Sequence, residues 1–288
     1  MAMHSIAGMA ASISANLKRI AKEKGQPLPV DLDNKNAVEA YIKANNDKYI
    51  GAWNQQLKRQ KFDHVYTQSL WSGQTPITFN FNNWDSSRQI SKQHAEQLKQ
   101  QAQQLAQRML MPNDETFNVT LEGSPGTGKT SLAVAMIDYI RYHGYRWGYL
   151  KHPDGFVDKY KRYADVFFLA TDEMLELVYR SIDSDSKALD RLQQVVKFAK
   201  TADVLVLDDF GTEGGMKGTI RPVHKTMQEL MYNINNARGK KYTIITTNNT
   251  VDELRNMYNV KLISRLIPSN PQHIIDFSGL ADFRRQIL

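Results

Sequence analysis

Cysteine is absent from all 288 residues, so disulfide bonds and thiolate zinc sites are excluded. The seven histidines are scattered along the chain, and no pair of them has the spacing of metal ligands. No apolar run approaches the roughly 20 residues that a membrane-spanning helix needs. The mildly apolar segment at residues 6–13 is followed, not preceded, by positive charges, which is unlike a signal peptide. These absences predict a cytoplasmic protein without zinc and without a membrane partner.

The composition is ordinary for a globular chain, apart from an excess of positive charge. Hydrophobic residues make up 41% and charged residues 23% of the sequence, which suits one large domain or a domain with an appendage. The net charge of +7 and the isoelectric point near 9.3 favour an anionic partner such as nucleic acid. Many basic proteins bind no nucleic acid, so the charge alone leaves the partner open.

A glycine-rich segment, Gly-Ser-Pro-Gly-Thr-Gly-Lys-Thr at residues 123–130, fits the pattern of a loop that cradles phosphate groups. It follows an apolar run at 117–121, typical of a strand, and opens into a helical pattern at 131–140. Glycine lets the backbone turn its N–H groups onto phosphate oxygens, and a helix amino terminus adds positive charge there. ATP or ADP is therefore expected here, with Lys129 on the β- and γ-phosphates and Thr130 on Mg²⁺. The predicted nucleotide-binding residues are Gly123, Ser124, Pro125, Gly126, Thr127, Gly128, Lys129, Thr130 and Ser131.

Two adjacent carboxylates follow a second apolar run. Residues 204–207 are Val-Leu-Val-Leu, as in a strand buried on both faces, and Asp208 and Asp209 come directly after them. Ligands bind at the carboxyl ends of strands in open α/β sheets. Taken alone, the acid pair is only a turn signal, but together with a phosphate loop it is the pair expected of a nucleoside triphosphatase. Asp208 is predicted to hold Mg²⁺, directly or through water, and Asp209 to orient and deprotonate the attacking water.

Strand and helix patterns alternate along the rest of the chain. Further strands are expected at 165–170, 241–247 and 273–277, with helices between them. Thr171 is expected to cap the helix after the first of these strands. Asn248 either lies between the acid-bearing strand end and the γ-phosphate, or belongs only to the turn before a capping box. The alternation predicts an α/β fold with a mainly parallel sheet.

The first 75 residues are predicted to form a separate helical domain, and residues 76–288 the nucleotide-binding domain. Helical patterns run roughly over 10–24 and 36–61, with few apolar residues for a core of their own. Such a module either docks on a partner or remains a solvated helical hairpin.

Aromatic and basic residues interleave over residues 145–162, on both sides of a His-Pro-Asp-Gly turn signal. Bases stack on aromatic rings and phosphates pair with lysine or arginine, so such a surface suits single-stranded nucleic acid. Lys159, Lys161 and Arg162 are the candidate contacts. The other interpretation is a hairpin insertion whose rings pack on the domain or on a neighbouring subunit.

The order of these motifs resembles the AAA+ ATPase domain of the bacterial and phage DnaC/DnaI helicase-loader family. The resemblance implies an AAA+ fold with a five-stranded, mainly parallel sheet flanked by helices, preceded by a small all-helical domain. By the same resemblance Asn248 falls on sensor 1, Arg265 on the arginine finger that acts on a neighbouring subunit's nucleotide, and Arg284 on sensor 2. Arg285 is an alternative for the last position. The matching pieces are 79–84, 123–130, 204–213, 243–248, 263–266 and 282–284.

This resemblance further implies a slow ATPase that depends on self-association or on a partner. Its amino-terminal domain would bind a hexameric replicative helicase of the DnaB type, and its ATPase domain would engage single-stranded DNA. The chain departs from the family in having Asp209 where glutamate is commoner, and in longer stretches at 145–164 and 212–220. Two alternatives stay open: an IstB-like transposition accessory ATPase, and a nucleotide-gated DNA-binding protein with little hydrolysis.

Overall fold

The computed structural model describes residues 31, 34, 36–38, 40–41, 64–110, 116–151, 157–215 and 219–282. The chain divides into two compact units, Met1–Gln60 and Lys61–Leu288. The predicted amino-terminal helices fall largely outside the described residues. Within the predicted helix at 36–61, residues 36–38 and 40–41 are described and are helical.

The division lies before the expected boundary at residues 75 and 76, because the segment ahead of that point packs on the larger unit. Leu70 forms a parallel bridge with Leu169, and its N–H donates to the carbonyl of Phe168 at 2.8 Å. The ring of Trp71 stacks on that of Phe168, with 3.9 Å between ring centroids. The larger unit therefore begins earlier than the composition suggested.

A five-stranded sheet with the order β4-β5-β6-β1-β7 forms the centre of the larger unit, and every neighbouring pair of strands is parallel. The predicted α/β class with a five-stranded, mainly parallel sheet is thus confirmed. β4 and β5 are buried at all five positions, as expected for parallel strands covered on both faces. The strands are β1 (Asn118–Glu122), β4 (Val166–Ala170), β5 (Val204–Asp208), β6 (Tyr242–Thr247) and β7 (Ile274–Asp276).

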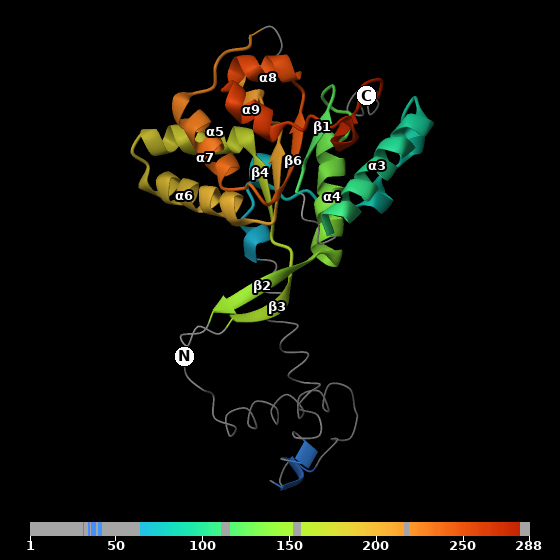
Figure 1. The fold of residues 1–288 in the computed structure, drawn as a ribbon, viewed down its shortest axis with the longest axis vertical. Coiled ribbons are helices and arrows are strands. Elements are labelled where there is room, and N and C mark those ends of the chain that lie inside the picture. Colours follow the sequence, from blue (N-terminus) through green and yellow to red (C-terminus); the bar gives the residue numbers. More distant parts are fainter. Residues whose placement is uncertain are drawn as a thin grey trace. The chain divides into compact units, whose positions relative to one another are not determined.

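Helices cover both faces of this sheet (Figure 1). Successive side chains of a strand point to opposite faces, so in β5 Val204 and Val206 join one apolar core while Leu205 and Leu207 join the other. The first core contains residues of α3 (Lys92–Leu110) and α4 (Lys129–His143). The second contains residues of α5 (Thr171–Ile182), α6 (Ser186–Thr201), α7 (Lys225–Asn236), α8 (Val251–Met257) and α9 (Val260–Leu266).

The stretch of interleaved aromatic and basic residues forms a hairpin between α4 and β4. Its strands, β2 (Tyr145–Lys151) and β3 (Val157–Tyr163), are antiparallel and make a two-stranded sheet of their own. Among the described residues, no helix has both the length and the apolar character to cross a membrane. Short 3-10 helices lie at Ser72–Gln74, Phe81–Asn83, Ser86–Arg88, Thr212–Gly214 and Pro271–His273.

Candidate functional site

The phosphate loop connects the carboxyl end of β1 to the amino end of α4, and glycines shape its backbone. Gly123, Gly126 and Gly128 have positive φ angles of 142°, 75° and 99°. A Cβ atom at Gly123 would lie 2.8 Å from the Cβ of Phe277, so both conformation and space require glycine there. Gly128 is the N-cap residue of α4 and brings no side chain to the first N–H groups of the helix. These N–H groups and the helix dipole are suited to an anion.

Lys129 is held inside this loop. Its side chain is buried, and Nζ donates to the carbonyl oxygens of Gly123 at 2.8 Å and Ser124 at 2.7 Å. The hydroxyl of Thr127 donates to the same Ser124 carbonyl at 2.9 Å. The ammonium group is thus already positioned within the loop that its motif assigns to phosphate.

Thr130 and Asp208 come together at the carboxyl ends of β1 and β5. Asp208 is 3% exposed, and its Oδ1 accepts a hydrogen bond of 2.6 Å from Thr246 on the neighbouring strand β6. Burial, and secondly the charge of Asp209, raises the pKa of Asp208 to about 6, against opposing hydrogen bonds from Thr246 and Thr130. Hydroxyl and carboxylate oxygens are preferred ligands of Mg²⁺. A cation would also offset the cost of the buried charge, so Thr130 and Asp208 fit a Mg²⁺ site.

Asp209 and Asn248 lie beside this pair. Asp209 is half-buried and has a φ of +52°, which is uncommon for a residue with a side chain, and its N–H donates to Thr246 Oγ1 at 2.9 Å. Asn248 is exposed and follows β6, which lies between the acid-bearing β5 and the β1 strand that leads into the phosphate loop. The topology therefore gathers the loop, both acids and Asn248 where the parallel strands end, which we call the carboxyl edge of the sheet.

Arg265 lies at the opposite edge of the sheet, where the parallel strands begin, which we call the amino edge. The side chain of Asn118, the first residue of β1, donates to the carbonyl oxygens of Arg265 at 3.0 Å and Leu266 at 2.8 Å. The first and last residues of a five-residue strand are about 13 Å apart. The guanidinium is exposed and donates to Asn236 Oδ1 at 2.6 Å. It is therefore directed away from the phosphate loop of its own chain.

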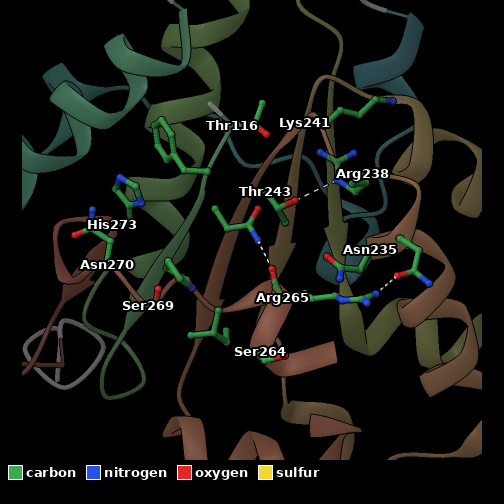
Figure 2. A pocket seen from close by; sticks show the side chains of 16 residues that line it. Thr116, Asn235, Arg238, Lys241, Thr243, Ser264, Arg265, Ser269, Asn270 and His273 are labelled. Carbon is green, nitrogen blue, oxygen red and sulfur yellow. Dashed lines mark hydrogen bonds between the residues drawn. The ribbon is translucent and has the colours of Figure 1, made fainter. Parts of the chain in front are cut away.

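Arg265 lines an open pocket of about 530 Å³ (Figure 2). Its walls come from the amino ends of β1 and β6, the carboxyl end of α7, and α9 with the segment that follows it. Lys241 and Arg238 also line it, but both donate to backbone carbonyls near the carboxyl end of α6. The remaining lining residues are Thr116, Phe117, Asn118, Asn235, Asn236, Gly239, Thr243, Ser264, Ile267, Pro268, Ser269, Asn270 and His273.

The sequence of this ATP-site domain matches one protein family over most of its length. The model of IstB-like ATP binding proteins aligns with residues 86–267. The chain belongs to the IstB-like ATP-binding protein family. It carries an ATP-binding domain, as the phosphate loop predicted. No curated protein matches the sequence.

Solved structures similar to this IstB-like protein include DnaI, DnaA and a DNA replication initiation factor. DnaI is 14% identical over 70% of this chain and 91% of its own, with a TM-score of 0.48. AMPPCP-bound DnaA from Aquifex aeolicus is 16% identical over 74% and 54%, with a TM-score of 0.48. A DNA replication initiation factor is 16% identical over 66% and 48%, with a TM-score of 0.45. The IstB-like chain spans about half the length of the last two, and at these scores the likenesses assign it neither activity nor partner.

Among the predicted nucleic-acid contacts, Arg162 has partners within the IstB-like domain itself. Its guanidinium donates to both carboxylate oxygens of Asp203, at 2.7 and 2.9 Å, and to Asp165 at 3.2 Å. This bidentate pair ties the end of β3 to the start of β5. Lys159 and Lys161 lie in β3, where the structure describes the backbone. Arg284 and Arg285 lie outside the described residues.

Sequence reasoning missed a buried cluster behind the acid pair. Thr171 does not cap α5; Ala170 is the N-cap residue, and no side chain caps that end. The Thr171 hydroxyl instead donates to Glu213 at 3.0 Å, and Tyr258 donates to the same carboxylate. The only available signal was the position of Glu213 within Asp-Asp-Phe-Gly-Thr-Glu.

Proposed function

We propose that this IstB-like ATPase is a helicase loader, which uses ATP to place a hexameric DnaB-type replicative helicase on single-stranded DNA. The observation that carries the proposal is the separation of Arg265 from the phosphate loop within one chain. A site that needs a residue from a second copy requires a head-to-tail contact between copies, which generates rings or open helical assemblies. Such an assembly suits the task of handling a ring-shaped partner.

In the proposed site, Lys129 and the loop N–H groups bind the phosphates of ATP, and Thr130 and Asp208 hold Mg²⁺. Mg²⁺ would neutralise negative charge on the phosphates. Asp209 accepts a proton from the attacking water and Asn248 orients that water. Arg265 of a neighbouring copy stabilises the charge that develops on the transferred phosphoryl group. Arg284 stays the proposed sensor 2, with Arg285 as the alternative, and turnover is slow unless copies or a partner assemble.

For DNA, we propose that one face of the hairpin carries the contacts. The register pairs Trp147 with Lys161 and Tyr149 with Lys159, and alternate positions of a strand share a face. These four residues therefore occupy one face, with the spacing of an aromatic and cationic platform for single strands. Arg162 occupies the other face and serves to anchor the hairpin through Asp203.

Replacing Lys159 and Lys161 together by glutamate tests this face. Single-strand affinity should fall by at least about tenfold at moderate salt, and the salt dependence should become shallower because fewer phosphates are neutralised. The same double change at Lys187 and Lys240, two exposed residues elsewhere, is the matched control. Equal losses in both variants would mean that only net charge matters.

The loading step is tested with the full chain. We expect it to co-elute with the host's replicative helicase in the presence of ATP and to stimulate unwinding that starts on circular single-stranded DNA. A chain that binds no helicase but binds a transposase would instead support the alternative of an IstB-like transposition accessory ATPase. The Asp209→Ala variant addresses the second alternative: unaltered loading without hydrolysis would identify a nucleotide-gated binding protein.

A further inference from the structure

A third acidic residue, Glu213, lies near the acid pair, and both of its carboxylate oxygens accept hydrogen bonds. It is 6% exposed. Its Oε2 accepts from the N–H of Gly211 and the hydroxyl of Thr171, both at 3.0 Å, and its Oε1 accepts from the hydroxyl of Tyr258. Burial raises the pKa of Glu213, while these hydrogen bonds oppose the rise. Both carboxylate oxygens are therefore hydrogen-bonded, and the donors lie in three segments: the start of α5, the loop after Asp209 and the end of α8.

Two of these segments hold the backbone around Asp209. The Thr171 hydroxyl lies 3.2 Å from the carbonyl oxygens of both Asp208 and Asp209. Gly211, whose N–H the Glu213 carboxylate accepts, is two residues beyond Asp209. The left-handed conformation of Asp209 is unfavourable for a residue with a Cβ and needs such support. Glu213 thus fixes the loop on both sides of the carboxylate proposed to receive the water proton.

The third segment leads to the helix that carries Arg265. The ring of Tyr258 stacks on that of Phe210, with 4.8 Å between centroids and an angle of 12°. Tyr258 is the C-cap residue of α8, and Asn259 is the N-cap residue of α9. Side-chain packing strengthens the link, because a Cβ at Gly214 would lie 2.6 Å from Met257, the last residue of α8.

We infer that Glu213 is a positioning residue, which holds Asp209 in place and, through Tyr258, couples the acid pair of one chain to the α9 helix that bears Arg265. The coupling to Arg265 rests on the proposed action of that residue on a neighbouring copy. With this coupling, the position of Arg265, which is proposed to act on the neighbour's nucleotide, would depend on the arrangement of the acid pair in its own chain. Successive sites in an assembly would then not act independently.

Single variants test the positioning role. Tyr258→Phe keeps the ring stacked on Phe210 but removes the hydroxyl; kcat should fall about fivefold to tenfold with ATP affinity within twofold. Glu213→Gln should retain most of kcat, because its amide oxygen can accept from Gly211 and Thr171 while its amide N–H donates to the Tyr258 oxygen. Glu213→Ala should lose more than either. Tyr242→Phe, which removes another buried tyrosine hydroxyl, is the control. An unchanged kcat in Tyr258→Phe, with only a lower melting temperature, would overturn the positioning role.

A mixing experiment tests the coupling. Arg265→Ala chains supply intact sites, Lys129→Ala chains supply intact arginines, and Tyr258→Phe is added to one or the other. Turnover of the mixture should fall in both cases. A fall only when Tyr258→Phe is in the site-supplying chain would overturn the link to Arg265, and a fall only in the arginine-supplying chain would overturn the positioning of Asp209. If the parent mixture has no activity, the action between copies has failed, and with it the coupling. The single-variant kinetics still judge the positioning role.

Discussion

The two edges of the central sheet hold their functional groups in opposite ways. At the carboxyl edge, Lys129 and Asp208 are buried and bonded to neighbouring loop and strand atoms. At the amino edge, Arg265 is exposed on the wall of an open pocket. Groups that must be arranged before the substrate arrives gain from burial, whereas a group that must reach another molecule has to stay accessible. The contrast fits the proposal that one chain carries complementary parts of two different sites.

The buried charges at the two edges differ as well. Arg238, at the amino edge, donates to the carbonyl oxygens of Ala199, Ala202 and Tyr242 and to the Thr243 hydroxyl. Burial lowers its pKa to about 9, so it remains charged at neutral pH. Among the described residues, the hydrogen bonds that shift the pKa of Asp208 come from two hydroxyl groups, those of Thr246 and Thr130. The buried charge at the amino edge therefore stabilises the fold, whereas the buried charge at the carboxyl edge would be balanced by a bound cation.

The largest effect is expected at the carboxyl edge. Lys129→Ala should lower ATP affinity by more than about 100-fold and abolish turnover, because the loop loses its only cationic side chain. Fluorescent-nucleotide titration and phosphate release measure the two quantities. Lys187→Ala, at an exposed position of α6, is the control. Normal affinity and rate in Lys129→Ala would contradict the phosphate-loop assignment.

At the amino edge, Arg265→Ala should separate binding from turnover. ATP affinity should stay within about twofold, while turnover falls about 10³-fold, as for the loss of an arginine finger. Mixing with Lys129→Ala chains should restore part of the activity. Arg255→Ala removes an exposed arginine that pairs with Asp252 in α8 and should change neither quantity. Without restoration on mixing, Arg265 would serve its own chain's structure and the contrast between the edges would lose its functional meaning.

Stability gives the next effect. Arg238→Met should lower the free energy of unfolding by roughly 3 kcal/mol, because four acceptors lose a charged donor. In a unit of this size, such a loss corresponds to a fall in melting temperature of about 6–12 °C. Thermal unfolding followed by circular dichroism measures it, with the exposed Lys240→Met as control. A melting temperature unchanged by Arg238→Met would show that these bonds are replaced by water at no cost.

Much of this contrast was predictable from sequence, but only where local patterns determine it. The parallel sheet followed from alternating strand and helix patterns, and the meeting of Thr130 with Asp208 followed from two motifs at strand ends. The capping box at Thr250 and Glu253 was also visible, and it is present in α8. Each of these depends on neighbours in sequence or on the rule that parallel strands share an edge.

Side-chain partners distant in sequence were not predictable. Tyr258 lies 45 residues after the Glu213 carboxylate that it contacts. Arg162 was interpreted as a surface cation, yet it pairs with Asp203, 41 residues further on. The Thr171 hydroxyl fits the pattern of a helix cap, but it donates to a buried carboxylate that packing brings close. Short-range capping rules fail where tertiary contacts offer a stronger acceptor.

The smallest predicted change in stability is also the sharpest test of the contrast, since it has the opposite sign to that of Arg238→Met. Burial raises the pKa of Asp208 from 3.8 to about 6, so the folded state holds its proton more tightly than the unfolded state. The ionised side chain therefore costs stability above pH 6, and the cost declines as the pH falls from 6 towards 4. Asp208→Asn removes the charge but keeps an oxygen acceptor for Thr246. Without Mg²⁺ or nucleotide, it should raise stability by about 1–2 kcal/mol at pH 7.5 and by nothing near pH 4.

The exposed Asp252→Asn is the control for this measurement and should show no gain at either pH. In Asp208→Asn the gain in stability should accompany a loss of turnover of more than about 100-fold, because the carboxylate proposed to hold Mg²⁺ is gone. Urea unfolding at the two pH values and phosphate release decide the matter. A variant less stable than the parent at pH 7.5 would mean that Asp208 is a structural charge like Arg238, and the two edges would then be alike. A gain in stability together with lost turnover would establish that the carboxyl edge keeps a buried charge for its function, at the expense of stability.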